Sequence, residues 1–206
     1  MLDSFLVDAI CGWTAAEQDE WIAHPTGDAE FADCIGIVDA TYVRVYRPHT
    51  YSRERRLYSD YKKYHAVFFV AIVDRRGRFR YVDAGNTPRG SSETAALYLA
   101  RDVFLRRGLF LLADVAYTGD DRCKTGFRAA QLNPELVGAQ QAEDNKSYNS
   151  RLSSIRIRVE HAFSRLKHTW QILQSTWKMP LDRIIPTFRA CCLLTNYLHR
   201  VRELHK

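Results

Sequence analysis

The stretch CIGIVDATYVRVY, residues 34–46, decides the fold, because it combines a strand pattern with a carboxylate in its apolar row. Residues 35–46 are strongly β-prone, and every second residue from Ile35 to Val45 is expected on one face of the strand. Asp39 takes the place of an aliphatic side chain in that row. A carboxylate in a buried strand is costly unless a cation or hydrogen-bond donors compensate it. Asp39 is therefore the first candidate functional residue.

Three further segments predict strands that complete a sheet. Residues 64–74 (YHAVFFVAIVD) are almost continuously apolar, which is the pattern of a strand covered on both faces. Residues 74–78 (DRRGR) predict a hairpin turn into a third strand over residues 79–84. Residues 109–113 (LFLLA) predict a short buried strand that ends at Asp114.

Helices are expected before, between and after these strands. A short lead-in is expected over residues 2–10, and Ser92 with Thr94 can cap a helix that runs to about residue 107. A short helix near residues 122–132 should lead into an irregular segment rich in Asn and Gln. Ser153 or Ser154 then opens a helix with a stripe of apolar residues at helical spacing, and a last helix covers residues 181–205. That stripe consists of Ile155, Val159, Phe163, Trp170 and Leu173.

The order of these elements predicts an α/β fold. Three strands form an antiparallel meander, a crossover helix leads to a fourth strand, and the resulting mixed sheet is flanked by helices. A chain of 206 residues is long enough for one domain with a full core. We therefore expect a lead-in over residues 1–30 and a single domain over residues 31–206.

Charge is unevenly distributed along the chain, although the net charge is only +6. Residues 1–46 hold nine acids and one base, whereas residues 47–80 hold ten bases and three acids. Residues 151–206 hold eleven bases and three acids. The basic segments could be solvated faces balanced by the acidic N-terminus, or they could form a surface that binds a polyanion.

The sequence gives no sign of a membrane protein or of a secreted one. No apolar run approaches the roughly 18 residues that a membrane span needs, and the apolar first ten residues contain two aspartates and no basic region. The five cysteines form no C-x-x-C pair, so free thiols in a reducing intracellular compartment are expected.

Asp39, Asp114 and Glu160 could converge on one point. If the first and fourth strands are neighbours, the two aspartates can face one another, and a helix packed across the sheet can supply Glu160. Arg156 and Lys167 lie on roughly the same face of that helix as Glu160. Carboxylates without His or Cys partners favour a hard cation, Mg²⁺ or Mn²⁺.

Each of the three acids also has a plain structural interpretation. Asp39 could be a buried aspartate that caps a bend, and Asp114 could simply end a strand. Glu160 could be a surface residue paired with Arg156 across one helical turn.

Five short motifs can be picked out along the chain: Val38-Asp39-Ala40-Thr41, a Gly-Ser element within Gly85–Ser91, Ala113-Asp114-x-x-Tyr117, Tyr148-Asn149 and Arg156-x-x-x-Glu160-x-x-Phe163-x-x-Leu166-Lys167. Together they resemble the DDE nuclease domain of PIF/Harbinger-type transposases and their domesticated relatives. The resemblance runs from about Phe31 to Trp177 and is most specific in its last motif. The chain departs from the family pattern at Ala40, at Ser92-Glu93 and at Ser164, and it lacks the helix-turn-helix region expected upstream.

This resemblance implies an RNase H-like fold and a two-metal nuclease. Asp39, Asp114 and Glu160 would be the catalytic metal ligands for Mg²⁺ or Mn²⁺ and would support DNA cleavage and strand transfer. The cations that would neutralise DNA phosphates are Arg156, Lys167, Lys62, Lys63 and Arg89. The family also implies transposon ends or a related duplex as substrate, a nuclear location and a separate Myb-like protein for DNA targeting. Pairing two DNA ends would require a homo-oligomer.

Other functions remain to be weighed against the nuclease. A catalytically silent, domesticated transposase could act as a nuclear DNA- or chromatin-associated adaptor, which the missing targeting region favours and the retained acids disfavour. An α/β hydrolase or a dehydrogenase is disfavoured, because the chain has no G-x-S-x-G elbow and no G-x-G-x-x-G after its first strand. The scattered histidines and cysteines suggest no zinc site.

Overall fold

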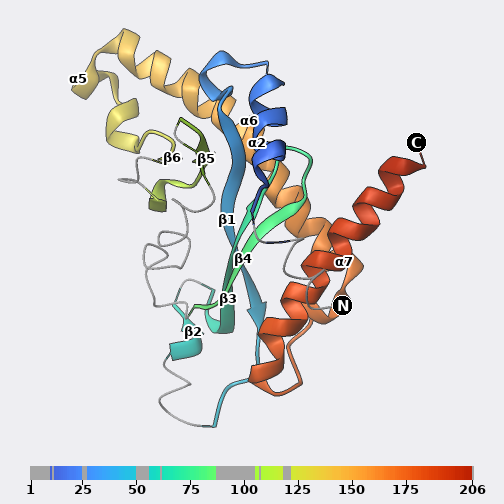
Figure 1. Cartoon of the computed structure of the whole chain (residues 1–206). Helices are drawn as coiled ribbons and strands as arrows, with labels where there is room; N and C mark the ends of the chain where they lie inside the picture. The colour runs from blue at the N-terminus through green and yellow to red at the C-terminus, as the bar shows by residue number, and fades with distance from the viewer. Residues whose placement is uncertain are drawn as a thin grey trace.

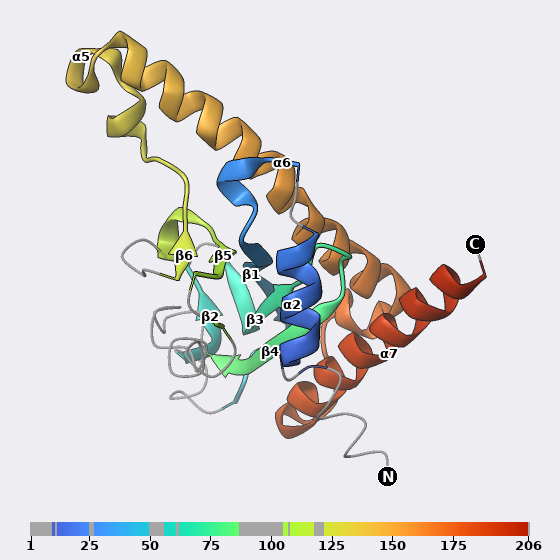
Figure 2. The same cartoon turned by 45° about the horizontal axis from the view of Figure 1, so that its top comes forward.

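The fold is α/β, with one sheet between two layers of helix (Figure 1 and Figure 2). The computed structural model describes residues 10, 12–24, 27–49, 56–60, 62–86, 105–106, 108–117 and 122–205, without the side chains of residues 83–86, 116, 203 and 204. Helix α2 (Ala15–Ala23) covers one face of the sheet. Helices α6 (Ala139–Thr169) and α7 (Ile184–Leu204) cover the other.

The sheet is mixed, as predicted, and is compatible with an RNase H-like arrangement. Strand β3 (Tyr64–Val73) pairs antiparallel with β1 (Cys34–Arg44) and with β4 (Phe79–Asn86). Strand β5 (Phe110–Leu112) pairs parallel with β1. Two strands of two residues each, which the sequence did not predict, complete the sheet: β2 (Tyr58–Ser59) beside β3, and β6 (Cys123–Lys124) beside β5.

Two predicted helices cannot be compared with the structure. The lead-in over residues 2–10 lies outside the described residues apart from Ile10, and so does most of the crossover helix over residues 92–107. The described residues of the N-terminal segment are well packed, because Trp13 and Trp21 are 7% and 5% exposed and belong to the core.

Both faces of the sheet are buried, which is what the continuous apolar run of β3 indicates. Between the sheet and helices α6 and α7, Phe69 of β3 stacks on Phe188 of α7 with ring centroids 3.9 Å apart. On the α2 side, Val70 and Ile72 of the same strand pack with Trp13 and Trp21. Alternate residues of β3 thus pack into the two cores on opposite faces of the sheet.

One predicted feature of β1 is wrong. Ile35 was expected on the same face as Ile37, but Ile35 packs in the α2-side core whereas Ile37 packs in the α6-side core. The pairing with β5 shifts register between Cys34 and Gly36, and a shift of one residue moves a side chain to the other face. From Ile37 onward the alternation is regular, so Asp39 lies in the row that faces α6.

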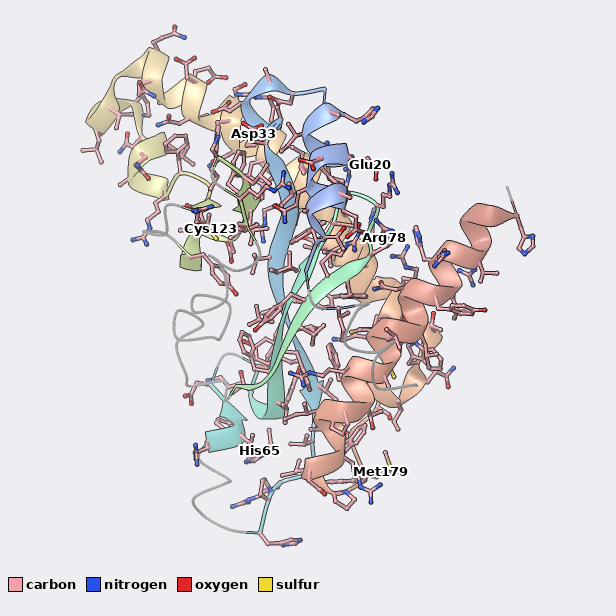
Figure 3. The ribbon with its side chains drawn as sticks, in the orientation of Figure 1. Glu20, Asp33, His65, Arg78, Cys123 and Met179 are labelled. Atoms are coloured by element: carbon pink, nitrogen blue, oxygen red, sulfur yellow. The ribbon has the colours of Figure 1, made fainter. Side chains whose placement is uncertain are left out.

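The turn between β3 and β4 anchors α2. Asp74 is fully buried and accepts hydrogen bonds from the backbone and side chain of Arg78 and from Arg80 Nε, each at 2.9 Å. Arg80 also pairs with Glu17 of α2 at 2.7 Å. Figure 3 shows Glu20 of α2 at the same end of the sheet as Arg78, and the labelled His65 near the opposite end of β3. These ion pairs tie the acidic N-terminal helix to the basic hairpin.

Helix α6 begins fourteen residues earlier than the expected start at Ser153, and this prediction was wrong. The helix expected near residues 122–132 is also absent: the chain forms β6 and a 3₁₀ turn, Ala129–Leu132, there. Amide side chains on the first turns of α6 hold the preceding segment. Asn149 bonds both the N–H and the carbonyl of Phe127, and Asn145 donates to the carbonyl of Gln131. The Asn and Gln residues that suggested an irregular segment therefore lie on a helix, where two of the Asn side chains bind the segment that precedes it.

Candidate active site

The candidate site forms where β1 and β5 part. Among the described residues, β5 pairs with β1 only as far as Ile37 and Leu112, while β1 continues to Arg44. The carboxyl end of a parallel strand, at a point where the sheet opens, is a general location for ligand sites in α/β proteins. A cavity of about 500 Å³ lies here, and its lining includes both Asp39 and Asp114.

Asp39 and Asp114 occupy equivalent positions relative to their two strands. Ile37 and Leu112 are register partners, and each aspartate follows its partner by two residues. Each carboxylate accepts a hydrogen bond from the next N–H along the chain, Ala40 N at 2.8 Å and Val115 N at 2.7 Å. Asp39 is half-buried, whereas the side chain of Asp114 is 57% exposed.

Helix α6 brings Arg156 and Glu160 to the same site. Buried Val159 and Phe163 fix this part of the helix against the sheet, so Arg156 and Glu160 lie one turn apart at the edge of the buried stripe. Arg156 Nη1 is 3.8 Å from Asp114 Oδ1. Arg156 Nε is buried and has no hydrogen-bond partner among the described residues. Glu160 itself is exposed.

The charges of these residues act on one another. Burial raises the pKa of Asp39, the negative charges of Asp114 and Glu160 raise it further, and the Ala40 N–H and Arg156 oppose the rise. Asp114 and Glu160 thus both act on Asp39, and the guanidinium of Arg156 opposes them. The surplus of negative oxygen donors suits a hard cation. In the described part of the chain, however, no three Asp, Glu, His or Cys side chains stand close enough together to hold a metal ion.

Two lysines line the other end of the same cavity. Lys167 of α6 donates from Nζ to the carbonyl of Tyr42 at 3.2 Å. Burial lowers the pKa of Lys167, and the nearby positive charge of Lys62 lowers it further. Lys62 Nζ also lies 5.9 Å from the centre of the Tyr42 ring. Two cations that repel each other at a cavity wall favour an anionic ligand.

The remaining two cations of the sequence prediction are not brought to this cavity. Lys63 is exposed, its φ is +59°, and it is not among the residues that line the cavity. Arg89 lies outside the described residues. The cavity therefore brings Asp39 and Asp114 together with Lys62 and Lys167. Arg156 is near it through Asp114, whereas Glu160 is not among its lining residues and acts on Asp39 through its charge.

Sequence reasoning missed the aromatic residues of the site. Tyr42, Tyr64, Phe68 and Tyr117 line the cavity together with the charged residues. Tyr117 belongs to the motif that carries Asp114, but its place in the cavity wall was not inferred from it. Tyr42 is the alternate residue of β1 that points away from the Asp39 row, a position that the strand pattern could have marked.

A second cavity of about 520 Å³ continues along β1 and α6. Tyr42, Tyr64 and Lys167 line both cavities, so the two are neighbours, and we refer to them together as the groove. The further walls of the second cavity are Arg44, Ser164, His168, Leu173 and Gln174.

A comparison with known proteins adds one finding to this geometry. A family model described as DDE superfamily endonuclease matches residues 38–196, which include Asp39, Asp114 and Glu160. No curated protein and no solved structure matches the chain. Within the described residues, none of the helices has the length and apolar character needed to cross a membrane.

Proposed function

The chain belongs to the DDE superfamily endonucleases, and from this premise we propose that it is the catalytic domain of a metal-dependent transposase of the PIF/Harbinger type. Its reaction is the hydrolysis of a DNA phosphodiester bond, followed by strand transfer. One observation supports the proposal most directly. Asp39 and Asp114 each lie two residues beyond the last paired residues of the parallel strands β1 and β5, and the charge of Glu160 acts on Asp39.

The three acids have defined roles in this proposal. Asp39 and Asp114 would be ligands of one divalent ion, and Glu160 would help to hold a second. When bound, Mg²⁺ or Mn²⁺ supplies an activated water or 3′-hydroxyl and stabilises the leaving oxygen. The chain itself supplies fixed carboxylates: the backbone N–H groups of Ala40 and Val115 orient them.

The cations hold the DNA backbone beside these acids. Lys167 is fixed by the Tyr42 carbonyl and faces the cavity together with Lys62. Contacts of this kind supply affinity and position without reading sequence. Arg156 lies 3.8 Å from Asp114 and compensates the carboxylates, and it would be free to contact a phosphate if a metal took over that role.

The biological setting follows from the same premise. The substrate is the end of a transposon or a related duplex, and joining two ends requires a second copy of the chain. A separate Myb-like protein supplies DNA targeting, and the site of action is the nucleus.

Cleavage by single variants tests the proposal. Asp39→Asn and Glu160→Gln should each reduce Mg²⁺- or Mn²⁺-dependent nicking of DNA by at least about 100-fold, because losing one ligand removes several kcal/mol of charge stabilisation. Asp182→Asn, an exposed acid in the 3₁₀ turn Leu181–Arg183, is the matched control and should cut like the parent. If either site variant cuts as well as the parent, the assignment is wrong.

A second candidate function is a catalytically silent adaptor on the same fold. The position of Arg156 favours it, because a guanidinium 3.8 Å from Asp114 can replace a metal as the lasting partner of the acids. Calorimetric titration with Mn²⁺ separates the two functions. Absence of binding at millimolar metal favours the adaptor, and binding that disappears in Asp39→Asn favours the nuclease.

A further inference from the structure

The groove consists of two cavities, and only the first is lined by the carboxylates of the candidate site. Its first cavity holds the acids at one end and Lys62 and Lys167 at the other. Its second cavity, of about 520 Å³, contains no acid among its described lining residues and is equally large. Because Lys167 lines both cavities, a DNA strand whose phosphate binds Lys167 could reach the second cavity with its next nucleotide.

The walls of the second cavity have the composition of a base-binding site. Tyr42 and Tyr64 provide aromatic rings, and each has a cation near it: Lys62 Nζ is 5.9 Å from the Tyr42 ring and Arg44 Cζ is 5.2 Å from the Tyr64 ring. Leu173, 2% exposed, adds an apolar surface. Aromatic rings interleaved with cations are the usual means of holding unpaired nucleotides.

Polar groups at the rim of this cavity can meet the edge of a base. His168 Nδ1 lies 2.7 Å from the carbonyl oxygen of Ser164, to which it donates, and 3.3 Å from the Ser164 hydroxyl. Gln174 donates from Nε2 to the carbonyl of Lys167 at 2.8 Å. In the described part of the chain these bonds leave His168 Nε2 and Gln174 Oε1 for a ligand, so the cavity offers hydrogen-bonding groups as well as stacking surfaces.

We propose that the second cavity binds an unpaired nucleotide of the DNA strand whose backbone lies on Lys62 and Lys167, with its base against Tyr42 and Tyr64. The inference rests on the proposed function, which makes DNA the substrate, and it adds that the substrate has an unpaired nucleotide next to the reacting phosphodiester. An intact duplex gives such a cavity no advantage, because its bases are stacked and paired and expose no face to an aromatic wall.

The experiment measures binding apart from cleavage. The Asp39→Asn protein in EDTA is titrated into fluorescein-labelled DNA of three kinds: a blunt duplex, the same duplex with a 3′ single-stranded extension, and one with a 5′ extension. One extended duplex should bind about 5- to 100-fold more tightly than the blunt one, the range expected for stacking one base. Equal affinity for all three probes, or binding to none, overturns the proposal.

Variants of Tyr64 assign the preference to the cavity. Tyr64→Ala should remove the preference for the extended duplex, measured as the ratio of the extended-duplex affinity to the blunt-duplex affinity, whereas Tyr64→Phe should keep this ratio because the ring remains. Tyr197→Ala, which removes a tyrosine 54% exposed on α7, is the matched control. If Tyr64→Ala weakens both probes equally, the ring does not hold a base and the proposal fails.

A second variant, which fills the cavity instead of removing a wall residue, checks that the effect of Tyr64→Ala does not come from misfolding. Ser164 is exposed on α6, so Ser164→Trp should fill the second cavity without disturbing the core, and the melting curve verifies this. It should abolish the preference, and Ser154→Trp on the same helix should not. Metal-dependent cleavage by the parent protein is scored separately, so failure of the nuclease function is distinguishable from failure of this inference.

Discussion

Asp39 and Asp114 occupy matching positions on neighbouring strands, each two residues beyond the parallel register pair of Ile37 and Leu112. This register explains why both aspartates line one cavity, although they are far apart in the sequence. Helix α6 then adds Arg156, with Nη1 at 3.8 Å from Asp114 Oδ1. The site is therefore a pair of carboxylates with one guanidinium near them, and we expect any metal binding there to depend on this balance of charge.

Removing Arg156 should strengthen metal binding. Arg156→Gln takes away a positive charge that competes with a cation for Asp114, and the gain should be about 1–2 kcal/mol, or roughly 5- to 30-fold in the Mn²⁺ dissociation constant. Calorimetric titration with Mn²⁺ measures it. Arg158→Gln, on the same helix but beside Arg75, is the matched control and should leave the affinity unchanged. Weaker Mn²⁺ binding in Arg156→Gln would contradict this account.

Neutralising Asp39 should stabilise the metal-free protein. Burial and the negative charges of Asp114 and Glu160 make the ionised form of Asp39 unfavourable in the folded protein. Asp39→Asn removes this free-energy cost, because the amide carries no charge. In EDTA at neutral pH, Tm should rise by about 2–6 °C. Mn²⁺ should raise the Tm of the parent and not that of the variant. A lower Tm in Asp39→Asn, with Asp182→Asn unchanged, would show that Asp39 is a structural residue.

Glu17 should stabilise the fold only above acidic pH. Burial raises the pKa of Glu17, but the Thr14 N–H and Arg80 outweigh it, so the net pKa is lowered. A lowered folded-state pKa gives stability that is present above the unfolded pKa and lost as the pH falls through the folded one. Because 30% of the Glu17 side chain is exposed, Glu17→Gln should cost only about 0.5–1 kcal/mol at pH 7. Melting curves at pH 7 and pH 3 test this, and an equal loss at both would contradict it.

Lys167 should contribute to DNA binding through its charge. Lys167→Gln should weaken binding of all duplex sequences alike and reduce the slope of log affinity against log salt by about 1. Fluorescence anisotropy at several salt concentrations gives the slope. Lys178→Gln, an exposed lysine after α6, should leave it unchanged. An unaltered slope in Lys167→Gln would place this lysine outside the DNA path.

Asn149 should hold the segment before α6 in place. Its amide makes two hydrogen bonds to the backbone of Phe127, at 2.8 and 3.1 Å. Asn149→Ala leaves those backbone groups without partners and should cost about 1–3 kcal/mol, as measured by urea unfolding. Gln140→Ala, which loses only an exposed side-chain bond to Asp144, should be nearly neutral.

Strands could be predicted from this sequence because each has a strong local pattern. The apolar run of β3 and the Asp74–Gly77 turn are determined by neighbouring residues. Asp39 within β1 and Asp114 after β5 were likewise marked by the apolar runs around or before them. The side of Ile35 could not be predicted, because a register shift depends on how β5 pairs. The start of α6 was missed because its first turns bury amides rather than apolar side chains.

The candidate site was predictable to a similar extent. Asp39 and Asp114 were marked by charge in or after apolar runs, and Glu160 by its place at the edge of a helical apolar stripe. The structure adds the effect of Asp114 and Glu160 on the pKa of Asp39, and the metal-binding role of the three stays a prediction. The groove was not predictable, because Tyr42, Tyr64 and Gln174 come from three distant segments that only the fold brings together.

The unbroken course of α6 has one further consequence. Glu160 and Lys167 are seven residues apart on a single rigid rod, which places them about 10 Å apart along its axis. In the proposed nuclease, this helix would set the distance between the carboxylates that cut the strand and the lysine that binds it. Inserting one residue between Glu160 and Lys167 would turn the helix beyond it by about 100°, and we expect such an insertion to change which bond is cut.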